Sequence, residues 1–78
     1  ANTRIRIEGN TDATGNYNSN IELSKKRAQS VADYLVQQYG VNKNRIVVVG
    51  NGPKHAIKDG VQGDNINYRT TDLNLLAD

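Results

Sequence analysis

The first residues of the chain alternate between apolar and charged, which is the pattern of a β-strand with one buried face. Over Arg4–Glu8, Ile5 and Ile7 share one side of the predicted strand and charged residues occupy the other. Nearly every residue from 10 to 19 is a turn former, so a loop is expected there. The pattern therefore predicts a strand that ends at Gly9 and leads into a long polar loop.

A longer period follows this loop and predicts one helix over about residues 20–39. Ser19 and Glu22 have the spacing of a capping box, with Asn20 as the competing cap residue, and Gly40 is the expected stop signal. Apolar residues recur at steps of three and four and form a single stripe for packing. The members of this stripe are Ala28, Val31, Ala32, Leu35, Val36 and Tyr39.

Two further strands are predicted after the helix. Arg45–Val49 is apolar on both faces, as expected for a central strand that is covered on both sides. Residues 50–68 show no sustained period, and we expect a functional loop with a short helical turn. Arg69–Leu76 alternates again and predicts a third strand. The expected fold class is α/β (α+β), a two-layer sandwich in which one long helix packs on a mixed sheet.

Composition and charge narrow the range of functions. The chain has 78 residues, enough for one small domain with one core, and it contains no Cys, Met, Trp or Phe. The net charge is only +2 and the signs alternate, so nothing resembles a nucleic-acid-binding arm. No apolar stretch approaches the roughly 18 residues of a membrane span. We therefore expect no nucleic-acid partner and no direct membrane insertion by this segment.

Enzyme and metal interpretations find little support in the sequence. The single histidine, His55, stands in the predicted loop beside two lysines, and Ser24 and Ser30 lie on the helix without a nucleophile elbow. The segment Gly50–Gly52 lacks the third glycine of a dinucleotide fingerprint. The segment Asp12–Glu22 lacks the carboxylates and the glycine position of a calcium loop. We expect no catalysis, no metal and no cofactor.

The polar loop at the carboxyl end of the first strand is the best candidate for a binding site. In open α/β sheets ligands bind at this end of the strands. Asp12 lies in the loop, and Arg27 lies two turns into the helix beside the apolar stripe. Together they can hold a zwitterion, with Asp12 taking an ammonium and Arg27 taking a carboxylate as a fork. The alternative is that Asp12 and Arg27 pair with each other and fasten the loop to the helix.

Several short blocks of sequence occur in a characteristic order along nearly the whole chain: Ile5–Asp12, Gly15, Asn20, Leu23-Ser24, Arg27-Ala28, Val31, Tyr34-Leu35, Gly40-Val41, Arg45-Ile46, Gly50, Gly52 and Asn67-Tyr68-Arg69. Together they resemble the OmpA-like C-terminal peptidoglycan-binding domain family. Its pattern is a strand ending in Gly-His-Thr-Asp, a glycine-bearing loop, and Asn-x-x-Leu-Ser-x-x-Arg-Ala opening a helix.

The resemblance implies a function and a set of site residues. Domains of this family grip the diaminopimelate of the peptidoglycan stem peptide without hydrolysing it. Carried over by motif, Asp12 would bind the ammonium and Arg27 the carboxylate, with Asn20, Arg69 and backbone N–H groups near Thr14 assisting. The domain would then act in the periplasm and anchor a larger, outer-membrane-associated envelope protein to the cell wall.

The sequence departs from the family pattern at three positions. Asn10 replaces the histidine of Gly-His-Thr-Asp, Tyr68 replaces the first arginine of Asn-Arg-Arg, and Thr70 replaces the valine that follows. The family domain also begins with an additional strand and helix. We therefore expect residues 1–78 to be an OmpA-like peptidoglycan-binding domain without its first strand and helix, leaving a sheet edge or a helix-covered face exposed.

Two other functions remain open at this point. One is a protein–protein interaction module on the same fold that uses Tyr17, Tyr68 and the long loop. The other is a small anion-binding domain that uses the N-terminus of the helix. A homodimer also remains open.

Overall fold

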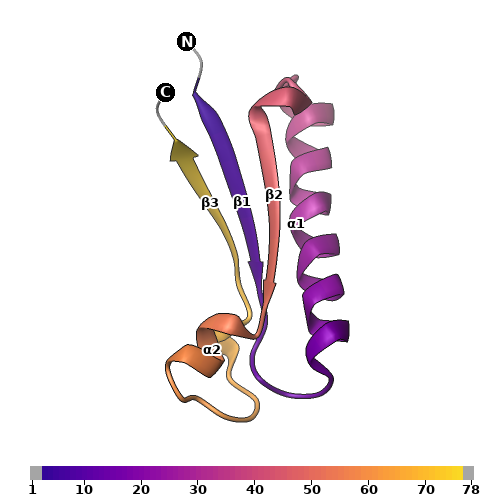
Figure 1. The fold of residues 1–78 in the computed structure, drawn as a ribbon. Coiled ribbons are helices and arrows are strands. Elements are labelled where there is room, and N and C mark those ends of the chain that lie inside the picture. Colours follow the sequence, from indigo (N-terminus) through magenta and orange to yellow (C-terminus); the bar gives the residue numbers. More distant parts are fainter. Residues whose placement is uncertain (1–2, 77–78) are drawn as a thin grey trace.

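The computed structural model describes residues 3–76. Its elements are β1 (Arg4–Asn10), α1 (Tyr17–Tyr39), β2 (Ile46–Gly52), α2 (Lys54–Lys58) and β3 (Thr71–Leu76), with 3₁₀ turns at Lys43–Arg45 and Ile66–Tyr68. Strand β1 lies in the middle of the sheet, parallel to β2 and antiparallel to β3. Helix α1 packs along the sheet on one side (Figure 1). The predicted fold class, a mixed three-stranded sheet with one long helix on it, is confirmed.

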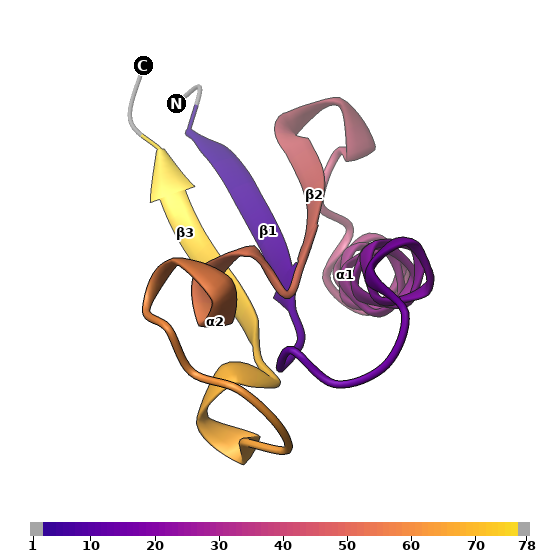
Figure 2. The ribbon, with the colours of Figure 1, turned by 60° about the horizontal axis from the view of Figure 1, so that its bottom comes forward.

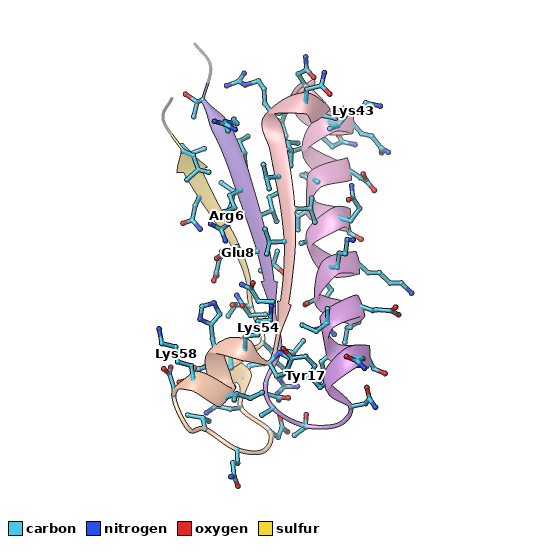
Figure 3. All side chains as sticks on the ribbon, viewed as in Figure 1. Arg6, Glu8, Tyr17, Lys43, Lys54 and Lys58 are labelled. Carbon is cyan, nitrogen blue, oxygen red and sulfur yellow. The ribbon has the colours of Figure 1, made fainter. Side chains whose placement is uncertain are left out.

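The core lies between α1 and the face of the sheet that it covers. Ile7, Ala28 and Ala32 are its buried members, and Ile5, Val31, Leu35, Ile46 and Val48 pack around them. The charged side chains of β1 project the other way, as predicted: Arg6 and Glu8 lie on the side of β1 away from α1 (Figure 3) and form an ion pair at 2.8 Å.

Tyr39 was predicted as the last member of the apolar stripe, but it is 68% exposed. Its ring stacks edge-on against Tyr34, with the ring centroids 5.9 Å apart. The helix ends at this residue, beyond the turns that face the sheet core, so Tyr39 has little to pack against.

Three glycines allow the N-terminal half of α1 to lie directly on the backbone of the sheet. A Cβ at Gly9 would stand 2.0 Å from the carbonyl oxygen of Ser24, and one at Gly50 would stand 2.7 Å from Lys25 Cβ. At Gly52 a Cβ would stand 2.7 Å from Ile21. The buried Ser24 hydroxyl closes this contact by accepting a hydrogen bond from the Gly52 N–H at 2.9 Å. This close approach fixes the start of α1 beside the ends of β1 and β2.

The helix begins three residues earlier than predicted. Asn16 is the N-cap, and its side-chain oxygen accepts a hydrogen bond from the backbone N–H of Ser19 at 3.0 Å. The predicted capping box of Ser19 and Glu22 is therefore wrong, because both residues lie inside the helix and Asn16 already supplies the cap. The predicted stop is confirmed: Gly40 adopts the left-handed conformation with φ 65° and ends the helix.

The prediction of a central position for the Val-rich strand was wrong. Strand β2 is at an edge of the described sheet, and Val47 is 42% exposed on the face away from α1. Residues 46–49 are all apolar, so their pattern does not indicate which face of β2 is buried; Ile46 and Val48 are the residues that pack on the core. The short helical turn expected in residues 50–68 is present as α2.

The third strand starts at Thr71 rather than Arg69, and it forms the other edge of the described sheet. Each of its six residues is exposed, including Leu73 and Leu75, so one edge and part of one face of the sheet lie open. Among residues 3–76, neither helix is long and apolar enough to span a lipid bilayer.

Substituting Gly9 by Ala tests the close approach of α1 to β1. The new methyl group meets the Ser24 carbonyl, and overpacking of this kind costs about 3 kcal/mol of unfolding free energy. Gly63→Ala is the matched control, since it adds a methyl group in open space and costs about 1 kcal/mol from its positive φ alone. Chemical denaturation followed by circular dichroism measures both, and equal losses would contradict the packing described here.

Candidate functional site

The chain that leaves β1 is held between the ends of β2 and β3. The Thr11 N–H donates to the Gly52 carbonyl at 2.8 Å, on the β2 side. On the β3 side, Asn10 and Thr70 exchange two backbone hydrogen bonds, at 2.8 and 3.2 Å. Asn10, Thr11 and Asp12 are buried although all three are polar, and these bonds satisfy backbone groups of the buried segment. The start of the loop is thus a fixed extension of the sheet, and it positions Asp12.

Asn10 fills the position of the family histidine by hydrogen bonding to both neighbouring strands. Its side-chain N–H₂ donates to Asp72 Oδ2 at 3.2 Å and lies 3.4 Å from Thr70 Oγ1, and its oxygen accepts from Asn51 Nδ2 at 3.1 Å. An amide both donates and accepts, so asparagine satisfies this turn without an imidazole. Sequence reasoning did not find Asn51 or Asp72, because their contacts follow from strand pairing and not from a motif.

Asp12 is the centre of the site. Its Oδ1 accepts from the N–H of Thr14 at 3.1 Å and from the Thr14 hydroxyl, while Oδ2 accepts from the N–H of Asn65 at 3.1 Å. Arg69 Nε lies 3.3 Å from the same Oδ2. Asp12 is 4% exposed, so this buried charge depends on these four donors.

These contacts also fix the charge of the site. The hydrogen bond from the Thr14 hydroxyl, followed by the bond from the Asn65 N–H, lowers the pKa of Asp12 from 3.8 to about 2. Asp12 is therefore ionised at every physiological pH. Asn65 had no recognisable signal in the sequence, since its contribution is a backbone N–H that the chain fold brings to residue 12.

Arg69, and not Arg27, is the ion-pair partner of Asp12. The Arg69 guanidinium lies between two carboxylates, with Nε facing Asp12 and Nη2 at 2.6 Å from Asp64 Oδ1. The alternative in which Asp12 and Arg27 pair with each other is therefore not observed. Arg27 is exposed on α1, and its guanidinium forms no hydrogen bond or ion pair with any residue in the part of the chain that the structure describes.

The five predicted site residues nevertheless line one hollow. It has a volume of about 370 Å³ and lies between the loop after β1, the first turns of α1 and the segment before β3. Figure 2 shows these three segments meeting at one end of the sheet. Asn20 Nδ2 donates to the Thr14 carbonyl and ties the helix to the loop. The complete lining is Thr11, Asp12, Thr14, Asn20, Leu23, Arg27, Asp64 and Arg69.

The hollow carries two acids and two bases, so its formal charges cancel. Asp12, Arg69 and Asp64 form one connected chain of ion pairs. Of the two arginines in the lining, Arg69 has both carboxylates as partners, whereas the guanidinium of Arg27 has no partner among residues 3–76. The lining therefore places an ionised carboxylate, Asp12, and a guanidinium without a partner among the described residues, Arg27, in one hollow.

Two residues singled out in the sequence lie outside this hollow. The Tyr68 hydroxyl donates to Asp59 Oδ2 at 2.7 Å, and this bond raises the pKa of Tyr68. His55 is exposed on α2, with Nε2 at 3.4 Å from Asn51 Nδ2. Within residues 3–76 no three histidine or carboxylate side chains converge as metal ligands. The hollow around Asp12 is therefore the site that the sequence motifs and the geometry share.

Comparison with known proteins identifies the family. Residues 1–70 match the OmpA family, and the chain belongs to it. It is 39% identical to outer membrane porin F of Pseudomonas aeruginosa over 69 residues, which is 86% of this chain and 20% of that protein. It is 41% identical to outer membrane protein A of Klebsiella aerogenes over 71 residues, or 91% of this chain and 20% of that one.

A third relative has a name that states its ligand. The peptidoglycan-binding protein ArfA of Mycobacterium tuberculosis is 48% identical over 54 residues, which is 69% of this chain and 16% of ArfA. The chain thus spans at most about a fifth of the length of these three relatives.

The low pKa of Asp12 predicts a specific acid sensitivity. A carboxyl group whose pKa is lower in the folded protein contributes stability that is fully present above its unfolded pKa and is lost as pH falls through its folded pKa. We therefore expect the unfolding free energy to decrease between about pH 4 and pH 2 as Asp12 is protonated. Denaturant titrations across this range measure it, and an Asp12→Asn variant with the same pH slope as the wild type would contradict the assignment.

Proposed function

We propose that this domain binds peptidoglycan non-covalently and without catalysis, through the diaminopimelate of the stem peptide. The proposal is carried by one observation: the same hollow is lined by an ionised carboxylate, Asp12, and by a guanidinium that has no described partner, Arg27. The side-chain end of diaminopimelate carries one ammonium and one carboxylate on the same carbon. A ligand of this kind adds no net charge to a hollow whose own charges cancel.

Each end of the zwitterion has a partner in the lining. Arg27 presents a planar fork that matches a carboxylate in two parallel hydrogen bonds. Asp12 receives the ammonium when the Thr14 hydroxyl, which is free to rotate, releases its bond to Oδ1. Asn20 and Arg69 supply further polar contacts from the rim of the same hollow.

The chemistry of the hollow supports binding over hydrolysis. An acid with a pKa of about 2 is a poor general base near neutral pH, because it holds a proton too weakly. The single histidine lies on α2 and does not line the hollow. The site therefore suits a reversible grip, in which loss of one charge-assisted contact lowers affinity by about tenfold.

The family relationship supports a role in anchoring. One relative is named as a peptidoglycan-binding protein and two others as outer membrane proteins, so we place this domain in the periplasm, as part of a larger envelope protein. Peptidoglycan repeats the same stem peptide many times over one polymer. A domain with modest affinity that leaves one stem peptide can then bind a neighbouring one, which keeps the host protein near the wall.

Co-sedimentation with purified sacculi of the diaminopimelate type tests this proposal. We expect the wild type to sediment, and Arg27→Ala to lose at least about tenfold in affinity because the carboxylate loses its fork. Lys26→Ala is the matched control, since Lys26 is an exposed neighbour on α1 outside the hollow. Free meso-diaminopimelate should release the wild type, whereas Nα-acetyl-lysine amide, whose side-chain end carries an ammonium without a carboxylate, should not.

Three outcomes would contradict the proposal. Equal sedimentation of the wild type and Arg27→Ala, with circular dichroism showing that both are folded, would mean that the contact is non-specific. Release by phosphate but not by diaminopimelate would favour an anion site instead. A folded wild type that does not sediment would favour a protein-interaction module on the same fold.

A further inference from the structure

The carboxylate of Asp64 occupies one edge of the Arg69 guanidinium inside the candidate hollow. Asp64 lies in the loop between α2 and the 3₁₀ turn Ile66–Tyr68, and its Oδ1 stands 2.6 Å from Arg69 Nη2. The Asp64 side chain is 76% exposed, whereas that of Asp12, which faces Nε of Arg69, is 5% exposed. The two ion pairs of Arg69 therefore differ in kind: the one with Asp12 is built into the fold, and the one with Asp64 faces solvent.

The contact between Asp64 and Arg69 uses the same chemistry as the proposed ligand. A guanidinium binds a carboxylate through the N–H donors of one edge, and an edge that already holds one carboxylate cannot hold a second in the same way. Asp64 and Arg69 both line the hollow, so a ligand carboxylate that approaches Nη2 of Arg69 meets the Asp64 carboxylate there. The Nε–H of the same guanidinium faces Asp12.

We propose that Asp64 is an internal competitor that stands in for the ligand carboxylate at Arg69 and weakens binding at this site. The inference rests on the proposed function, because it concerns the affinity of the same hollow for the same zwitterion. In the free protein Asp64 neutralises Arg69. On binding, the ligand carboxylate displaces Asp64 and bridges Arg27 and Arg69.

The local backbone favours such a displacement. Gly60 and Gly63 precede Asp64 in this loop with φ of 72° and 81°, and a Cβ added at either would meet no heavy atom within 4 Å. The loop segment that carries Asp64 thus has open space beside it. Solvent-exposed ion pairs contribute little free energy, so the exchange of one carboxylate for another needs no rearrangement of the sheet or of Asp12.

Calorimetric titration with free meso-diaminopimelate at low salt tests the inference. Asp64→Asn keeps the size of the side chain and removes the competing charge, so we expect affinity to rise about two- to fivefold over the wild type. Asp59→Asn is the matched control, since it makes the same charge change in the preceding turn and Asp59 contacts Tyr68 instead of Arg69. It should bind as the wild type does.

Combination with Arg69→Gln shows whether the effect passes through Arg69. If Asp64 competes for Arg69, then Asp64→Asn should give no gain once Arg69 is already replaced. A gain that persists in the Arg69→Gln background would overturn the proposal, because it would report only the lost negative charge at long range. Circular dichroism of each variant establishes that it is folded.

The remaining outcomes separate this inference from the proposed function. Binding by the wild type with equal or weaker binding by Asp64→Asn would overturn the competitor role and leave the wall-binding proposal standing. Binding by Asp64→Asn alone would support the competitor role strongly. The absence of binding by both proteins would overturn the inference and the proposed function together.

Discussion

The ionised carboxylate of Asp12 is the interaction on which the rest of the site depends. It sits at the end of the central strand, nearly excluded from water, and it is held by donors from Thr14, Asn65 and Arg69. Thr14 belongs to the same loop as Asp12, whereas Asn65 and Arg69 come from one segment more than 50 residues further along the chain. A buried charge is tolerated only when its hydrogen bonds are complete, so the same contacts that keep Asp12 ionised also set the shape of the hollow.

The position of α1 supplies the other half of the site. Gly9, Gly50 and Gly52 bring the backbone of the helix onto the backbone of the sheet, and Ser24 locks the contact. Because this contact lies in the N-terminal half of α1, the first turns of the helix reach the loop that carries Asp12. Arg27, one turn further along, is thereby presented at the rim of the hollow without being drawn into the ion pairs of the loop.

The sequence predicted the local structure well and the partners of the site poorly. Periodicity located α1, β1 and β3, and an apolar run located β2; α1, β1 and β2 pack on a shared core, whereas the residues of β3 are exposed. It could not show that β2 lies at an edge, since a run of valines has no polar positions to mark an open face. Motif order brought Asp12 and Arg27 to one hollow, but the ion-pair partner of Asp12 is Arg69, two residues before β3. That pairing is set by the antiparallel register of β1 and β3, which no short motif encodes.

The most direct test is a nitrogen-15 NMR titration of the labelled domain with meso-diaminopimelate, with Nα-acetyl-lysine amide, which has the side-chain ammonium but no carboxylate, in a parallel titration. We expect the backbone N–H signals of Thr14 and Asn65, which donate to Asp12, and the side-chain signal of Arg27 to shift most with diaminopimelate, and the lysine derivative to change them far less. Shifts that gather instead at the separate hollow between α1 and β2, around Val36 and Val48, with Thr14 and Asn65 unaffected, would contradict it.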